Sequence, residues 1–179
     1  QFTVIQYFDS IISRMEAANR LGYADTFRFT KNSLLKFNGN KDFSFSYVTP
    51  SFLIKYEEYL TGKSLAPNSI FLYLRTFKTL VNYARIDGIV SKSFDPFNSM
   101  SFSKYRNVKT RKRALPKEVI LKILNMGIDL KDPIYDYWNY FRFSYLCWVI
   151  NFIDMAYLKW DNIQGTTLQY TRQKTGDEF

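Results

Sequence analysis

The chain has 179 residues, of which 46% are apolar and 19% aromatic, so a packed core is expected and an intrinsically disordered class is excluded. A single cysteine, Cys147, and the lack of histidine exclude a disulfide framework and histidine-based acid–base chemistry, and no metal site is expected. Without an apolar run of transmembrane length or a basic signal-peptide start, we expect a protein of the reducing cytoplasm.

The net charge of +9 is concentrated in the middle of the chain. Residues 91–115 hold seven Lys and Arg against one Asp, whereas residues 116–179 are close to neutral. Such a concentration of positive charge indicates a polyanionic partner. The alternative is a linker whose charge only keeps it in solution.

The first half has the pattern of four helices joined by short loops. Apolar side chains recur at steps of three and four residues, as on the buried face of a helix. The third helix has a sharp start, with Thr49 as N-cap and Pro50 at the first helical position. We expect the four helices at about residues 2–20, 24–38, 50–61 and 67–86, terminated by Gly22, Gly39, Gly62 and Gly88.

Three shorter helices are expected in the second half, at about residues 117–126, 133–149 and 152–160. A hairpin around Thr166–Gly176 is expected to be the only β structure. The predicted fold class is therefore mainly α: a four-helix unit, a basic linker, and then a few helices with one β-hairpin.

Several short sequence phrases resemble those of a known superfamily. They are Tyr23–Phe27, Ala66–Phe77, Asp95–Phe97 and Arg113–Glu118. In this order they are similar to the second-helix start, the fourth-helix opening, the exit from the bundle and the start of the catalytic domain in the tyrosine recombinases, the phage-integrase superfamily. The resemblance implies a SAM-like core-binding domain at 1–90, an interdomain linker at 91–115 and the N-terminal part of a catalytic domain at 116–179.

The run Tyr170–Gly176 is similar to the hairpin that carries the catalytic lysine of this superfamily. There a tyrosine forms a 3′-phosphotyrosine while the lysine acts as general acid on the leaving 5′-oxygen, and the resemblance gives that role to Lys174. Aligned on Asp154–Leu158, the first catalytic arginine of the family falls at Asn151, which can donate hydrogen bonds but brings no charge. A shifted alignment gives Trp148, which is not an arginine either. Integrases of the conjugative-transposon type also have a small polar residue where this chain has Asn151, so the departure indicates that subgroup.

The remaining catalytic groups of the superfamily have no match in the sequence. Without histidine there is no His-x-x-Arg motif, and the tyrosine nucleophile is expected well beyond Phe179. We therefore expect an inactive fragment that also lacks the optional arm-binding domain. The resemblance implies that the intact protein cuts and rejoins DNA as a homotetramer, with no metal, ATP or other cofactor.

DNA contact is also predicted from the placement of charge. Arg75, Lys78 and Arg85 lie at steps of three and seven on the fourth predicted helix, away from its apolar face, and Arg28 and Lys31 form a similar pair on the second. These cations would mostly contact phosphates of double-stranded DNA, in the bacterial nucleoid, and position the protein there. The linker adds six cations without an acid among them: Lys104, Arg106, Lys109, Arg111, Lys112 and Arg113.

Two other functions stay open at this level. One is a non-catalytic DNA-binding regulator on the same scaffold, which Asn151 would fit. The other is a basic helical adaptor that binds proteins and has no affinity for DNA.

Overall fold

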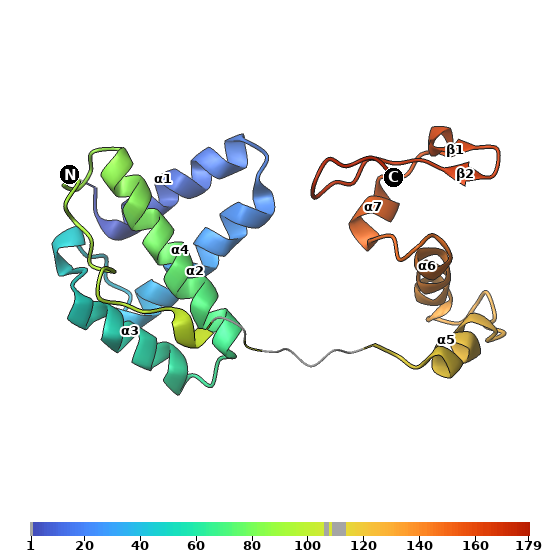
Figure 1. Ribbon diagram of the computed structural model, residues 1–179, viewed down its shortest axis with the longest axis horizontal. Helices are drawn as coiled ribbons and strands as arrows, with labels where there is room; N and C mark the ends of the chain where they lie inside the picture. The colour runs from blue at the N-terminus through green and yellow to red at the C-terminus, as the bar shows by residue number, and fades with distance from the viewer. Residues whose placement is uncertain (1, 106–107, 109–113) are drawn as a thin grey trace. The chain divides into compact units, whose positions relative to one another are not determined.

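The computed structural model describes residues 2–105, 108 and 114–179, and most of them lie in α-helices. The predicted fold class, mainly α with a small hairpin, is confirmed. The chain divides into two compact units, Gln1–Thr110 and Arg111–Phe179 (Figure 1). Within the described ranges, no helix is both long and apolar enough to cross a membrane.

The first unit begins with the helical pair α1 (Val4–Ala17) and α2 (Leu21–Phe37). Between them the chain reverses at Asn19, whose φ of 54° lies in the left-handed region. The Arg20 N–H donates to the Met15 carbonyl at 2.8 Å, as in a Schellman motif. The prediction that Gly22 ends the first helix is wrong, because Gly22 lies inside α2. Asparagine tolerates positive φ better than most residues, so it ends the helix before the glycine is reached.

Helices α3 (Pro50–Gly62) and α4 (Pro67–Ile86) complete the bundle, and the 3-10 helix η1 (Phe45–Tyr47) precedes α3. The Thr49 hydroxyl accepts the Phe52 N–H at 3.2 Å, which confirms the predicted N-cap. This cap satisfies one of the backbone donors that a helix start leaves unpaired.

The ends of α2, α3 and α4 test the other predicted terminators. Gly39 and Gly88 follow α2 and α4 with φ of 64° and 71°, as predicted. Gly62 is instead the last residue of α3, and the left-handed position after that helix is Ser64, with φ of 54°.

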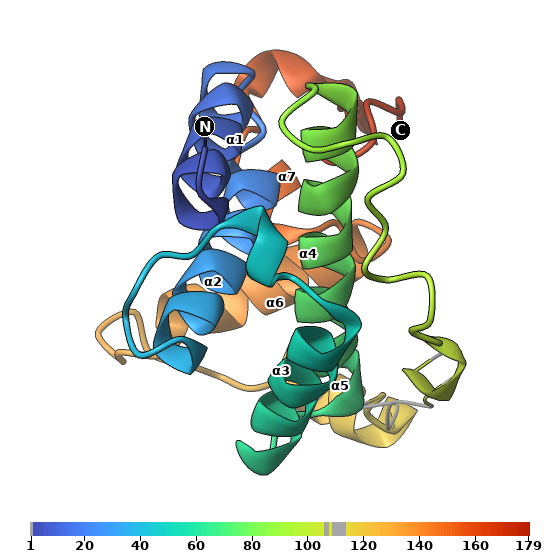
Figure 2. The ribbon, with the colours of Figure 1, turned by 90° about the vertical axis from the view of Figure 1, so that its left-hand side faces the viewer.

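The four helices of the first unit enclose its core (Figure 2). Phe77 of α4 is fully buried in this core. Its ring lies 6.2 Å from that of Phe8 on α1 and 6.5 Å from that of Tyr56 on α3, measured between centroids. The chain after α4 returns alongside that helix, and Phe97 packs edge-on against Phe77 at 5.7 Å. The start of the predicted linker is therefore part of this unit.

The helices of the second unit are shorter than the sequence predicts. Its helix α6 (Tyr135–Leu146) stops before Trp148 and Val149, whose φ values of 58° and 63° are incompatible with a continuing helix. Of the described residues in this unit, only Ile150 and Asp154 are buried. The helices are α5 (Lys117–Leu124), α6 (Tyr135–Leu146), α7 (Phe152–Ala156) and the 3-10 helix η3 (Trp160–Asn162).

Two successive chain reversals follow η3. Strands β1 (Ile163–Gln164) and β2 (Thr167–Leu168) pair antiparallel, with Gln164 opposite Thr167. Beyond them, Tyr170 and Phe179 exchange backbone hydrogen bonds of 3.0 Å, which closes a second hairpin-like turn. The hairpin predicted around Thr166–Gly176 is thus misplaced: the paired strands lie earlier, and most of the predicted range forms the second turn.

Candidate nucleic-acid interface

One face of the first unit combines cations with aromatic rings. The 3-10 helix η2 (Ser103–Tyr105), which begins the cationic run of the linker, packs against α4. We call the resulting set of residues the α4–η2 surface. It consists of Phe71, Arg75 and Lys78 from α4 with Phe102, Lys104 and Tyr105 from the returning chain.

The three rings of this surface are contiguous. The Phe71 ring lies 5.7 Å from that of Phe102, edge-on, and 6.2 Å from that of Tyr105, nearly parallel. Phe71 and Phe102 are half-buried and Tyr105 is buried. The rings therefore form an apolar floor that fixes the linker start to α4.

Each ring has a cation above it. The Arg75 guanidinium carbon lies 5.5 Å from the Phe71 centroid, the Lys78 Nζ 5.4 Å from that of Phe102, and the Lys104 Nζ 5.3 Å from that of Tyr105. Contacts of this kind are worth about 0.5–1 kcal/mol at exposed sites. They place three positive charges over the adjoining rings of one surface.

An acid of α3, Glu57, contacts two residues of the α4–η2 surface. Its carboxylate lies 2.8 Å from the Lys104 Nζ and accepts a hydrogen bond from the Tyr105 hydroxyl. Burial, and then the hydrogen bond and negative charge of Glu57, raise the pKa of Tyr105 well above its usual range. Tyr105 therefore remains a neutral donor to this carboxylate at physiological pH.

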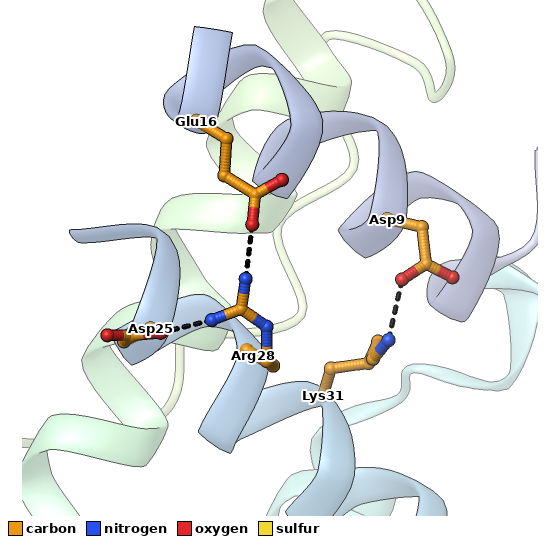
Figure 3. A network of polar contacts seen from close by, with 5 residues as sticks. All are labelled: Asp9, Glu16, Asp25, Arg28 and Lys31. Atoms are coloured by element: carbon orange, nitrogen blue, oxygen red, sulfur yellow. Dashed lines mark hydrogen bonds and ion pairs between the residues drawn. The ribbon is translucent and has the colours of Figure 1, made fainter. Parts of the chain in front are cut away.

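The other predicted cations of α2 and α4 have different surroundings. Arg28 forms ion pairs with Glu16 of α1 and Asp25 of α2, and the Lys31 Nζ lies 2.6 Å from a carboxylate oxygen of Asp9 (Figure 3). Three carboxylates face two cations there, so the charge of the pair is offset locally.

Arg85, the third predicted cation of α4, is half-buried and donates to the side-chain oxygen of Asn82 at 2.7 Å. Of the predicted cations that the structure describes, only Arg75, Lys78 and Lys104 come together on the α4–η2 surface. Five predicted DNA contacts lie outside the described residues: Arg106, Lys109, Arg111, Lys112 and Arg113.

The second unit places Lys174 at the tip of the turn closed by Tyr170 and Phe179, where the lysine is exposed. This turn is tied to α7 through Asp154, which is 2% exposed and accepts the Gln173 N–H at 2.8 Å. The Arg172 Nε lies 4.0 Å from the other carboxylate oxygen of Asp154. A buried acid on α7 thus fixes the backbone next to the predicted general acid.

Asn151 is the N-cap residue of α7, and its side chain makes no capping hydrogen bond. It lines a cleft of about 750 Å³ that Arg172 also lines. Lys174 is not among the residues of this cleft. In the described parts of the chain, no cluster of three or more acids and cysteines could hold a metal ion.

Four residues on or next to the α4–η2 surface are missed by the sequence interpretation: Glu57, Phe71, Phe102 and Tyr105. The spacing of Phe71 and Arg75, four residues apart on one helix, is a signal that could have identified one cation–ring pair. The other contacts join segments distant in sequence, and periodicity within one helix cannot reveal them.

The arrangement defines a small helical domain with a basic face. A family model described as phage integrase SAM-like domain matches residues 3–108, and the chain belongs to this family. This membership supports the predicted tyrosine recombinase superfamily. No curated protein and no solved structure matches the chain.

Proposed function

We propose that this chain is the DNA-binding portion of a site-specific tyrosine recombinase, an integrase of the conjugative-transposon type. The observation that carries the proposal is the α4–η2 surface, which groups three cations over aromatic rings in a unit that belongs to the integrase SAM-like family. Arg75 and Lys78 are the proposed phosphate contacts, with Lys104 and the five linker cations extending them. Double-stranded DNA is the partner.

Arg28 and Lys31 are weaker candidates for DNA contact than Arg75 and Lys78, because their charges are already paired. Each of the first two has an acid of α1 as partner, and phosphate would have to replace that acid. Arg75 and Lys78 instead contact rings, which do not compete with phosphate for the charge. The surface around α4 is therefore proposed as the principal face toward the duplex.

Titration of a labelled duplex at several salt concentrations tests this proposal. If about six phosphates are neutralised, the slope of log K against log salt is expected near −5. The double variant Arg75→Ala/Lys78→Ala should lower the steepness by about 2 and weaken binding to all sequences alike. Lys36→Ala/Lys41→Ala, which removes two exposed cations elsewhere, serves as the charge-matched control. Equal losses in the two double variants would contradict the proposed face.

In the intact recombinase, Lys174 is proposed as general acid for the leaving 5′-oxygen. The turn held by Asp154 supports this role, because it presents an exposed lysine on a fixed backbone. Asn151 occupies the position of the family's first arginine without its charge, and Arg172 supplies a cation in the cleft that both residues line. Arg172 is therefore a candidate to bind the phosphate that Asn151 cannot neutralise.

We propose that the tyrosine nucleophile and the His-x-x-Arg motif lie outside these 179 residues, and that the intact protein acts as a homotetramer on DNA. Incubation of this chain with a nicked suicide substrate should then give no covalent protein–DNA product, because the nucleophile is missing. A covalent product mapped to any tyrosine of this chain would overturn the assignment.

A second candidate function is a non-catalytic DNA-binding regulator. It is favoured by the asparagine at position 151, because such a regulator needs no arginine there. The gene sequence distinguishes the two, because only the recombinase requires a downstream His-x-x-Arg motif and tyrosine. A complete lack of DNA binding at low salt would instead favour an adaptor that binds proteins.

A further inference from the structure

Glu57 is an acid in contact with the cationic α4–η2 surface. It lies on α3, and its side chain is only 14% exposed, whereas that of its partner Lys104 is 60% exposed. The Glu57 carboxylate is therefore much better shielded from water than the lysine side chain, and the Tyr105 hydroxyl holds it on the bundle. A phosphate approaching Lys104 from solvent meets an ammonium group that already has an anionic partner.

We propose that Glu57 is an autoinhibitory residue of the α4–η2 surface, which lowers its affinity for DNA by keeping Lys104 in an ion pair that phosphate must replace. The proposal rests on the DNA-binding function argued above and adds a regulatory residue to that surface. Its ligand is the phosphodiester backbone of duplex DNA, which competes with the Glu57 carboxylate for the same ammonium group.

Two physical terms oppose phosphate binding at Lys104. Moving the lysine toward DNA leaves the Glu57 carboxylate without its cation in a largely buried position, where an unpaired charge is unfavourable. The carboxylate that remains also repels the incoming phosphate, because like charges at short range raise the free energy of the complex. The hydrogen bond from the Tyr105 hydroxyl offsets part of the cost of leaving the carboxylate without its cation, but it does not offset the repulsion of the phosphate.

The neighbouring acid Glu58 provides a matched comparison. It is exposed on the same helix, one residue further along, and no ion pair of the described residues includes it. Glu57→Gln and Glu58→Gln therefore remove the same formal charge from adjacent positions of α3. Only the first releases Lys104, and glutamine at position 57 still offers an oxygen to the Tyr105 hydroxyl.

The test is a salt titration of duplex binding by the full 179-residue chain and these two variants. Glu57→Gln should lower Kd about 3–10-fold at low salt and make the log–log salt slope steeper by about 0.9, as expected for one additional phosphate contact. Glu58→Gln should change Kd by less than about 2-fold, as a purely long-range charge effect screened by salt. Equal effects of the two variants, or weaker binding by Glu57→Gln, would overturn the proposal.

A double-mutant cycle with Lys104→Ala identifies the cation involved. Lys104→Ala should weaken duplex binding by a smaller factor in the parent chain than in the Glu57→Gln background, where it should also abolish the gain in affinity. A gain that persists without Lys104 would overturn the proposal. Tyr105→Phe loosens the linker start without changing the charge, so it should not reproduce the gain in DNA affinity. If it does reproduce the gain, release of the linker rather than of Lys104 is responsible.

Two further readouts keep the outcomes distinct. Thermal unfolding of each variant shows whether the bundle is intact. Glu57→Asp preserves the charge and should therefore show no gain in DNA affinity, which gives a second test if Glu57→Gln proves unstable. If the parent chain shows no salt-sensitive affinity for duplex DNA, the proposed function fails and this inference with it. If the parent binds and the two glutamine variants behave alike, this inference alone fails.

Discussion

The backbone N–H of Gln173 donates to Oδ1 of Asp154 at 2.8 Å, and this bond joins the turn that carries Lys174 to helix α7. Asp154 is buried, so the hydrogen bond is shielded from competing water. The same carboxylate faces the Arg172 guanidinium at 4.0 Å. Asp154 thus orients two groups: the backbone just before Lys174, and the Arg172 side chain that lines the adjacent cleft.

Replacement of Asp154 by alanine should loosen this turn. Hydrogen bonds to charged groups contribute about 1.5–3 kcal/mol, so amide exchange at Gln173 should accelerate about 10–100-fold. Hydrogen exchange of the full chain followed by NMR measures this rate directly. Asp161→Ala, which removes an exposed acid of η3, is the control and should leave the Gln173 rate unchanged. A Gln173 amide that exchanges equally fast in both variants would show that Asp154 does not hold the turn.

Local signals were enough to predict the helices of the first unit. Thr49 and Pro50 define the start of α3, and the left-handed glycines Gly39 and Gly88 follow α2 and α4, because capping depends on residues adjacent in sequence. Where another residue takes the left-handed position, as Asn19 does, the glycine rule selects the wrong end.

The candidate site could be predicted only in part. Helical spacing places Arg75 and Lys78 together, but it contains no information on Glu57, which reaches Lys104 across 47 residues of sequence. Likewise, the spacing of Arg28 and Lys31 predicts a cationic face without revealing the acids of α1 that pack against it. Whether a cation on one helix is paired with an acid depends on the segment packed against it, and sequence periodicity does not specify that segment.

The aromatic core of the first unit should depend strongly on Phe77. Its ring is fully buried against rings from α1, α3 and the returning chain, including Phe97 at 5.7 Å. Phe77→Ala should lower the free energy of unfolding by about 3–5 kcal/mol, as for other large core aromatics. Urea denaturation measures this loss, and Leu72→Ala, on the exposed side of the same helix, should cost far less. Similar losses for both variants would contradict the central position of Phe77.

Asp87, just beyond α4, should make stability depend on pH. It accepts hydrogen bonds from the Tyr7 hydroxyl at 2.8 Å and from Arg14 at 2.7 Å. The hydrogen bond from Tyr7, followed by the contributions of Arg14, holds the pKa of Asp87 below its ordinary value of 3.8, although burial opposes this. The unfolded state therefore binds the proton more readily, so this stabilisation is complete above the ordinary pKa and is lost as pH falls through the lowered one.

The expected result is a destabilisation by Asp87→Asn that is fully present at about pH 7 and shrinks as the pH falls below the ordinary pKa of 3.8 toward the lowered one. Denaturation midpoints at several pH values measure it. Glu58→Gln, at an exposed carboxyl, should show little difference at any of these pH values. If the effect of Asp87→Asn is the same at all of them, its ionised form does not stabilise the bundle.

The basic linker should contribute to DNA affinity without contributing to sequence preference. Replacing Arg111, Lys112 and Arg113 by alanine should reduce the steepness of the salt dependence by roughly 3 and weaken specific and random duplexes alike, because phosphate contacts do not distinguish bases. An unchanged slope in this triple variant would remove the linker from the contact surface. A loss confined to one sequence would indicate base contacts instead.

If the intact protein is the recombinase proposed above, Lys174 should matter for its chemistry and little for its DNA affinity. An exposed turn lysine that only supports folding could be replaced with a change of less than about 0.5 kcal/mol in stability. A general acid contributes about 10²–10⁴-fold to the rate, so Lys174→Met should slow cleavage by that order while duplex affinity stays nearly constant. Lys159→Met, at another exposed lysine of the same unit, should cleave at the parental rate.

A substrate with a 5′-bridging phosphorothioate separates proton transfer from other roles of Lys174. Its sulfur leaves without needing a proton, so it should restore much of the rate lost in Lys174→Met and give no comparable gain to the parent enzyme. This rescue would not occur if the lysine only neutralised a non-bridging oxygen, because the phosphate charge there is unchanged. Cleavage by Lys174→Met at the normal rate, or no rescue by the sulfur substrate, would therefore show that Lys174 is not the general acid.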